Sequence, residues 1–121
     1  MRVCDHVQCQ DFPCGDVNHA GYRIPAIDLQ PQTISIVLIS EASPLNAGDD
    51  YYAAGDPLFQ QTTVQAFRDA GAEVSTIHDI LNLGIYLTSA VKCSKTGYLI
   101  KPATIKTCSS LLEQELALFP N

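Results

Sequence analysis

The chain has 121 residues, which is enough for one domain with a buried core. Its apolar content of 46% and charged content of 17% are ordinary for a globular protein, and no apolar run approaches the roughly 20 residues of a membrane-spanning helix. The net charge of −6 argues against nonspecific attraction of nucleic acid by the whole surface, because such binding depends on Lys and Arg. We therefore expect one soluble domain with no membrane partner.

Residues 1–32 contain prolines and glycines without a sustained apolar period, and we expect an irregular, cysteine-containing lead-in segment there. Charges and cysteines interrupt its first part, MRVCDHVQCQDFPCG, where a signal peptide would have an apolar region. This pattern predicts a cytoplasmic protein whose cysteines are kept reduced.

Residues 33–40, TISIVLIS, are β-branched and almost continuously apolar, which predicts a strand covered on both faces in a parallel sheet. The apolar spacing over residues 57–70 predicts a helix that ends at Gly71. Residues 72–84, AEVSTIHDILNLG, are expected to hold a short strand and a turn. On a strand His78 and Asp79 would point to opposite faces, so we assign them no catalytic role.

Residues 85–92, IYLTSAVK, predict a second strand, and the order strand, helix, strand implies a right-handed parallel crossover. Apolar residues spaced by three or four from Pro102 to Phe119 predict an amphipathic helix. Residues 33–121 are therefore expected to form an α/β domain with three layers, α/β/α, around a central parallel sheet.

Acidic residues follow the first predicted strand, and a Lys-Cys pair ends the second. The first loop carries Glu41, Asp49 and Asp50, and the second strand ends at Lys92 and Cys93. Ligands of open parallel sheets bind beyond the carboxyl ends of the strands, so these groups are expected to face one crevice. The alternative is a solvated acidic loop without a site.

Four sequence features occur together in an order that resembles the uracil-DNA glycosylase superfamily. They are LISEASP, AAGDPLFQQTT, YLTSAVKC and IKTCSSLLEQELALFP. The resemblance covers residues 33–120 and is to the iron-sulfur-containing prokaryotic and archaeal glycosylases. It implies the N-terminal half of that fold and the hydrolysis of the N-glycosidic bond of a deaminated or damaged base in DNA. The family continues into a further strand and a His-Pro-Ser-like loop, so we expect a fragment or a truncated member.

The resemblance also implies roles for individual residues. Glu41 matches the glutamate of the loop that holds the catalytic water, and Asp49 and Asp50 fall near the family's acidic pair. Phe59 lies one position after the family's base-stacking phenylalanine. Ser89 replaces an asparagine that hydrogen-bonds the uracil edge; a hydroxyl offers fewer donors and acceptors than an amide, which leaves the preferred base open.

The residue types suit this chemistry. Base excision passes through an oxocarbenium-like state that a carboxylate stabilises while it orients water. An extruded base needs an aromatic face and hydrogen bonds to its edge. Tyr51 and Tyr52, beside the acidic loop, could cover such a base or could be ordinary loop residues.

The cysteines allow a metal centre. The related glycosylases hold a [4Fe-4S] cluster with two amino-terminal cysteines, the cysteine of the Lys-Cys motif and a helix cysteine. Cys93 and Cys108 match the latter two, and Cys9 and Cys14 are the expected amino-terminal pair, because Cys4 lies in a segment prone to fraying. The alternative is that Cys108 is a core residue and the others are free thiols.

Two other functions remain open at this point. One is a noncatalytic nucleotide- or DNA-binding module, favoured by Ser89 and by the missing final motif. The other is a structural metal-binding α/β domain, which rests only on the cysteines.

Overall fold

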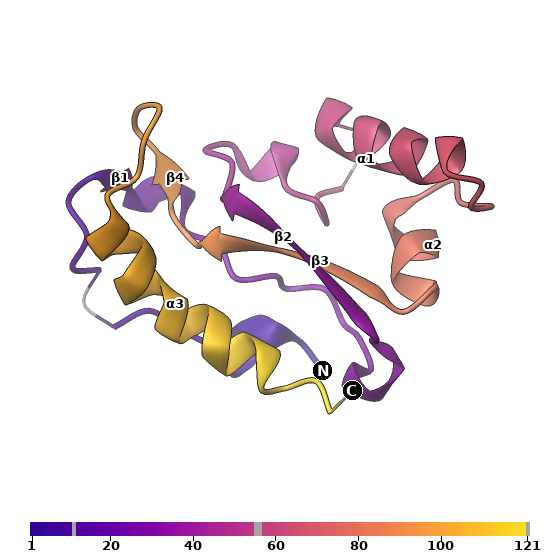
Figure 1. Cartoon of the computed structure of the whole chain (residues 1–121), viewed down its shortest axis with the longest axis horizontal. Coiled ribbons are helices and arrows are strands. Elements are labelled where there is room, and N and C mark those ends of the chain that lie inside the picture. The colour runs from indigo at the N-terminus through magenta and orange to yellow at the C-terminus, as the bar shows by residue number, and fades with distance from the viewer. Residues whose placement is uncertain (11, 55–56, 121) are drawn as a thin grey trace.

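The computed structural model describes residues 1–10, 12–54 and 57–120 (Figure 1). Its α-helices are α1 (Leu58–Asp69), α2 (Ile77–Asn82) and α3 (Pro102–Leu116), and its strands are β1 (Val17–Asn18), β2 (Ile36–Ala42), β3 (Ile85–Val91) and β4 (Ser94–Lys95). This mixture of helices and small sheets confirms the α/β class. None of the described helices has the length and apolar composition needed to cross a membrane.

The two long strands pair in parallel, as the order strand, helix, strand predicts. Ile36 pairs with Ile85 at the start of the ladder, and Ala42 pairs with Val91 at its end. The chain passes from β2 to β3 through α1 and α2. The carboxyl ends of both strands therefore meet at one edge of the sheet, next to the loop that follows β2.

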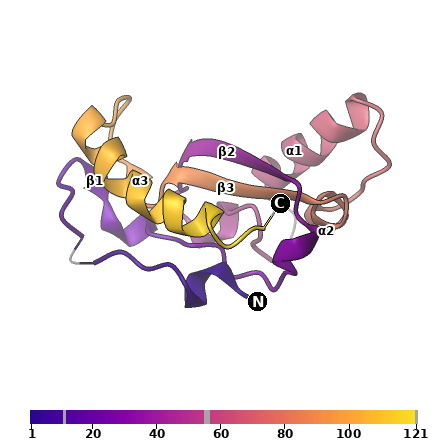
Figure 2. The same ribbon diagram turned by 60° about the horizontal axis from the view of Figure 1, so that its bottom comes forward.

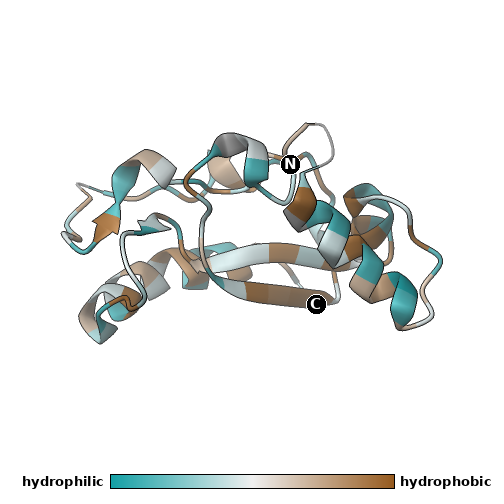
Figure 3. Cartoon of the chain, turned by 90° about the horizontal axis from the view of Figure 1, so that it is seen from above, coloured by the Kyte–Doolittle hydropathy of each residue, from teal (hydrophilic) through white to brown (hydrophobic). Residues whose placement is uncertain are grey.

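The two strands differ in how they are covered. β3 lies between α3 on one side and α1 and α2 on the other (Figure 1), and most of its residues are buried. In β2, by contrast, Ile36, Leu38 and Ile39 are 41–50% exposed. The prediction that residues 33–40 are covered on both faces is therefore wrong for the described structure. β2 has no strand on its outer edge among the described residues, and its apolar run is visible as a brown strand in Figure 3.

Side chains of β3 alternate between the two sides of the sheet. Tyr86 and Thr88 donate hydrogen bonds to Glu115 of α3. Leu87 packs instead with the buried residues of α1 and α2, among them Val64 and Ile80. Because neighbouring residues on a strand face opposite sides, Tyr86 and Thr88 face α3 and Ser89 faces the other side of the sheet.

The lead-in segment is irregular but belongs to the folded body. Its regular structure among the described residues consists of short 3-10 turns and β1, which pairs antiparallel with β4. Val3, Val7 and Leu29 are buried in the same core as Tyr86 and Leu111. Figure 2 shows the lead-in running alongside the strands and α3.

The expectation of a strand and turn in residues 72–84 is wrong, because this segment contains α2. The Thr76 side chain accepts a hydrogen bond from the Asp79 amide, and the Asp79 carboxylate accepts from the Thr76 amide. This capping box satisfies two amides that the first helical turn leaves unpaired. The backbone amides of Ser75 and Thr76 lower the pKa of Asp79. His78 and Asp79 lie on a helix, so the prediction that they point to opposite faces of a strand is wrong. Neither residue lines the pocket at the strand ends, which is described below.

Gly84 forms the turn between α2 and β3, and we expect Gly84→Ala to destabilise the fold. Its φ is +90°, and a Cβ atom there would lie 2.8 Å from the Thr33 carbonyl oxygen. We expect a loss of about 1–3 kcal/mol in the free energy of unfolding, measured with urea. Gly71 is the matched control, because its φ is +102° but a Cβ would meet no atom within 4 Å. An equal loss in Gly71→Ala would contradict a steric contribution at Gly84.

Candidate functional site

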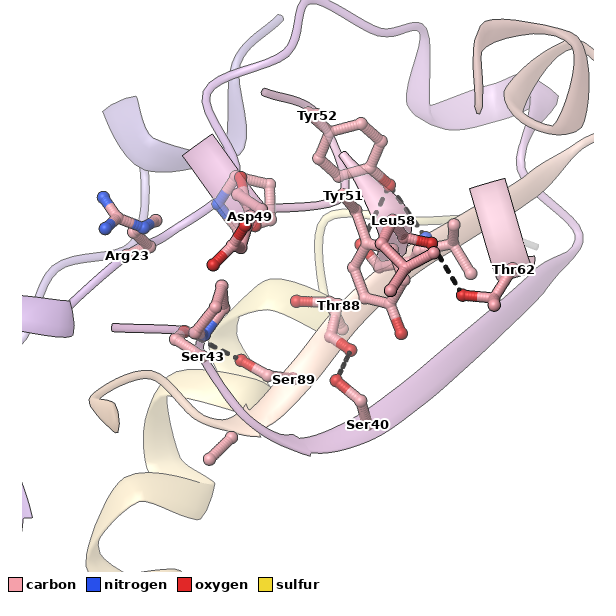
Figure 4. A pocket seen from close by; sticks show the side chains of 15 residues that line it. Arg23, Ser40, Ser43, Asp49, Tyr51, Tyr52, Leu58, Thr62, Thr88 and Ser89 are labelled. Carbon is pink, nitrogen blue, oxygen red and sulfur yellow. Dashed lines mark hydrogen bonds between the residues drawn. The ribbon is translucent and has the colours of Figure 1, made fainter. Parts of the chain in front are cut away.

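A pocket of about 560 Å³ lies at the carboxyl ends of β2 and β3 (Figure 4). Its walls come from both strand ends, the loop after β2, the start of α1 and the lead-in segment. Asp49, Asp50 and Ser89 line it, so the structure brings three of the predicted site residues together. The crevice expected beyond the strand ends thus corresponds to a cavity of ligand size.

Hydroxyl groups form one side of the pocket. The Ser43 and Ser89 hydroxyl oxygens are 3.3 Å apart, within hydrogen-bond distance, and both residues are buried. Ser40 donates to the Thr88 carbonyl oxygen at 3.1 Å. A ligand edge facing this side would meet hydroxyls that can rotate to donate or accept.

Tyr51 and Tyr52 form an aromatic side of the pocket. The Tyr52 hydroxyl donates to the Leu87 carbonyl oxygen and accepts from the Leu87 amide, each at 2.8 Å. These two bonds fix the ring against β3. Burial raises the pKa of Tyr52, so its hydroxyl stays protonated at neutral pH and remains a donor.

The acidic loop is anchored so that Asp50 is partly sheltered while Asp49 is exposed. The Gln60 side-chain amide donates to the carbonyl oxygens of Asp50 and Ala53, at 3.1 and 2.9 Å. Burial raises the pKa of the Asp50 carboxyl, against the opposing effects of the Tyr51 backbone amide and the Arg23 charge. The raised pKa makes the Asp50 carboxylate a stronger base than an ordinary aspartate.

Glu41 does not line the pocket. Its carboxylate is 3.1 Å from the Lys95 ammonium, and the two side chains are 56% and 31% exposed. Its neighbours Ser40 and Ala42 do line the pocket. Alternation along β2 explains the difference, because residues next to each other on a strand face opposite sides. The structure thus separates Glu41 from Asp49 and Asp50.

Of the two predicted base-contacting residues, the structure describes the side chain of only one. Ser89 lies in the pocket wall. The side chain of Phe59 lies outside the described residues, so its predicted role stays a prediction. Leu58, directly before it, lines the pocket and is 73% exposed.

Arg23 is a pocket residue that the sequence did not indicate. Its amide donates to the Lys92 carbonyl oxygen at 2.8 Å, and its Nη2 donates to the Leu45 carbonyl oxygen at 3.2 Å. These bonds join the lead-in to both strand ends. No local pattern marks such a contact, since Arg23 stands in an irregular segment far from either partner in the chain.

A second, polar pocket of about 630 Å³ lies between α1 and α2. Gln60, Arg68 and His78 are among its lining residues, and it shares Tyr51 and Tyr52 with the first pocket. None of the predicted catalytic, base-binding or metal-binding residues whose side chains the structure describes lines this pocket.

The four predicted metal ligands surround one small cavity of about 30 Å³. Cys9 and Cys14 reach it from the lead-in, Cys93 from the loop after β3, and Cys108 from α3. Cys4 does not line it. Its remaining walls are largely apolar, with Phe12, Val17, Val91 and Leu111 among them.

Of the cysteines around this cavity, Cys93 is buried and the other three are partly exposed. Burial, with a smaller contribution from the other three cysteines, raises the pKa of Cys93 to about 11. Burial also raises the pKa of Cys108, whose Sγ accepts a hydrogen bond from the Lys92 amide at 3.3 Å. Without a bound cation Cys93 and Cys108 are therefore neutral thiols at pH 7.

The spacing of these cysteines bears on the kind of metal they could hold. Among the described residues no three His, Cys, Asp or Glu side chains are arranged to hold a metal ion. Thiolates on one zinc ion lie about 2.3 Å from it, whereas the thiolates of a four-iron cluster bind separate iron atoms and stand further apart. The four cysteines around this cavity are the residues that would hold such a cluster.

Comparison of the chain with models of known protein families, with curated proteins and with solved structures gives no match.

Proposed function

We propose that this chain is a uracil-DNA-glycosylase-like protein that binds a deaminated or damaged base extruded from DNA and hydrolyses its N-glycosidic bond. The observation that carries the proposal is the pocket at the strand ends, where a half-buried Asp50 lies among tyrosines and hydroxyl groups. The sequence resemblance over residues 33–120 points to the same chemistry.

The pocket suits an extruded base. A base needs a flat apolar contact and hydrogen bonds to its edge, which Tyr51 and the Ser43 and Ser89 hydroxyls offer from different sides (Figure 4). The volume of about 560 Å³ lies in the range usual for small-molecule sites.

Asp50 is the proposed general base. Water attacks C1′ of the deoxyribose, and the electron pair of the C1′–N bond leaves with the base. Asp50 accepts one proton of the attacking water, and the departing base takes up a proton from solvent. The carboxylate also stabilises the positive charge that develops on the sugar.

The proposal includes the finer fold and the location of the protein. It places this chain as the N-terminal half of a three-layer α/β/α domain, to which further strands would add beside β2. The proposed location is the cytoplasm, where all five cysteines, which are free in the structure, stay reduced.

The proposal also includes a [4Fe-4S] cluster held by Cys9, Cys14, Cys93 and Cys108. Four thiols from three parts of the chain meet at one cavity, and the Lys92 amide already donates to the Cys108 sulfur. The cavity is small, so these side chains must rotate outward to admit a cluster. A bound cluster would act structurally, by joining the lead-in, the loop after β3 and α3.

We expect protein purified without oxygen to be brown and to contain about four iron atoms per chain. Cys93→Ala and Cys108→Ala should each lose most of this iron, because each removes one thiolate. Cys4→Ala is the matched control, because Cys4 lies outside the cavity, and its iron content should be unchanged. Iron and sulfide analysis measures this, and a folded wild-type protein free of iron would refute the cluster.

Release of free base tests the proposed function. The protein is incubated with single- and double-stranded DNA that contains uracil or hypoxanthine, and the free base and abasic sites are measured. The noncatalytic alternative has its own support, because Glu41 lies outside the pocket and the Ser89 hydroxyl is already within hydrogen-bond distance of Ser43. Salt-sensitive DNA binding without base release would establish that alternative and exclude the enzyme.

A further inference from the structure

Arg23 carries a hydrogen-bond donor that the described structure leaves without a partner. Its Nε is buried and has no acceptor. The rest of the residue is held in place, with its amide on the Lys92 carbonyl oxygen and Nη2 on the Leu45 carbonyl oxygen. Arg23 thus lines the pocket with a fixed side chain and a buried N–H group that has no acceptor among the described residues.

Arg23 forms no ion pair among the described residues, although its charge acts on the nearby Asp50 carboxyl. The ion pairs among the described residues join Met1 to Asp28, Arg2 to Asp5, Lys92 to Glu115 and Lys95 to Glu41, and Arg23 takes part in none of them. It is the one cation among the described residues that line the pocket. Buried donors in folded proteins nearly always have an acceptor, so an acceptor supplied by a ligand is the natural partner here.

The position of Arg23 indicates which part of a ligand it would meet. In Figure 4 Arg23 and Asp49 lie at one side of the pocket, and Tyr51, Leu58 and Thr62 lie at the other. A guanidinium binds phosphate oxygens with two parallel N–H groups, which a lysine cannot do. A ligand with an anionic end and a flat apolar end fits this separation.

We propose that Arg23 binds the phosphate of the nucleotide whose base occupies the pocket. The inference rests on the proposed function in that it takes the ligand to be a deoxynucleotide. Asp49 and Asp50 repel a free anion, so phosphate alone binds weakly, and selectivity comes from holding the base and the phosphate together. Arg23 therefore selects phosphorylated ligands over the corresponding nucleoside.

Binding of small ligands tests this inference on the full chain. Deoxyuridine, its 3′- and 5′-monophosphates and inorganic phosphate are titrated separately, with affinities taken from NMR chemical-shift changes. We expect at least one monophosphate to bind about tenfold more tightly than deoxyuridine, the size expected for a charge-assisted hydrogen bond. Equal affinity for nucleoside and nucleotides, or no binding of either, would overturn the inference.

Substitutions then assign the preference to Arg23. Arg23→Gln should bind the monophosphate no better than it binds deoxyuridine. Arg23→Lys should keep a smaller preference, and it serves as the test if Arg23→Gln does not fold. Lys106→Gln removes an exposed charge on α3 and should behave as wild type. A full phosphate preference in Arg23→Gln would overturn the inference.

The outcomes separate this inference from the proposed function. An Arg23-dependent phosphate preference without any base release would leave the inference standing and would refute catalysis. Base release with a phosphate preference that is unchanged in Arg23→Gln would support catalysis and refute the role of Arg23.

Discussion

Asp50→Asn should lower the rate of base release by about 10²–10⁴-fold, the usual contribution of a general base. Asparagine keeps the size of the side chain and its place in the loop but cannot accept a proton from water. The measurement is single-turnover release of uracil from DNA, in which chemistry is separated from product dissociation. DNA affinity should change little, because the loop remains anchored through Gln60.

Two other acid-to-amide substitutions make this test specific. Asp69→Asn is the matched control, since Asp69 lies on α1 outside the pocket, where its carboxylate accepts from Gln65 at 2.7 Å. Glu41→Gln separates two assignments, because the resemblance places Glu41 in the loop that holds the catalytic water, whereas the pocket geometry favours Asp50. A larger loss in Glu41→Gln than in Asp50→Asn would contradict the role proposed for Asp50.

As pH rises, ionisation of Asp50 should increase activity but decrease the stability of the fold. A general base works ionised, and burial raises the pKa of Asp50 above its ordinary 3.8, so the rate should fall as pH decreases through that raised value. A raised pKa means that the folded protein binds this proton more tightly than the unfolded chain. Its contribution to stability is then present below pH 3.8 and is lost as pH rises through the folded-state value.

Asparagine does not ionise, so Asp50→Asn should gain stability relative to wild type across that pH range while losing activity. Urea unfolding at a series of pH values measures this difference. A variant that is both inactive and less stable at neutral pH would indicate that Asp50 has a structural role instead.

Glu115→Gln should destabilise the fold by about 3–5 kcal/mol, the cost typical of breaking a buried ion pair. The Lys92 ammonium is 2.5 Å from Glu115, and both side chains are 0% exposed. The same ammonium donates to the Thr88 hydroxyl at 2.9 Å and to the Ser89 carbonyl oxygen. Losing the carboxylate would leave a buried charge with only neutral partners, and urea unfolding would show the loss.

A double-mutant cycle would show that the loss comes from the pair. Lys92→Met should cost a similar amount, and Lys92→Met combined with Glu115→Gln should cost less than the sum of the two single changes. The exposed pair of Lys95 and Glu41 is the matched control, with an expected coupling of no more than about 1 kcal/mol. Equal coupling in the two cycles would contradict the importance of burial.

Three groups of Lys92 join the two candidate sites. Its ammonium holds the Ser89 carbonyl oxygen at the pocket, its amide donates to the Cys108 sulfur, and its carbonyl oxygen holds the Arg23 amide. The ammonium, amide and carbonyl of one residue thus set the relative positions of the strand end, the cysteine cavity and the lead-in.

The sequence by itself determined the elements whose signals are local. The apolar spacing of residues 57–70 and 102–119 matched α1 and α3, and the β-branched runs matched β2 and β3, because side-chain periodicity follows directly from backbone geometry. α2 also has a local signal, the capping box of Thr76 and Asp79, but the helix is too short to show a clear apolar period.

Only the tertiary structure decided which of the candidate residues share a site. Asp49, Asp50 and Ser89 line one pocket, while Glu41 turns away from it, because its place in the pleat of β2 is fixed relative to a cavity that other parts of the chain complete. Arg23 reaches the same pocket through contacts with distant residues, for which no sequence period exists. Sequence patterns report neighbours along the chain, whereas the pocket and the cysteine cavity depend on long-range packing of the lead-in against β3 and α3.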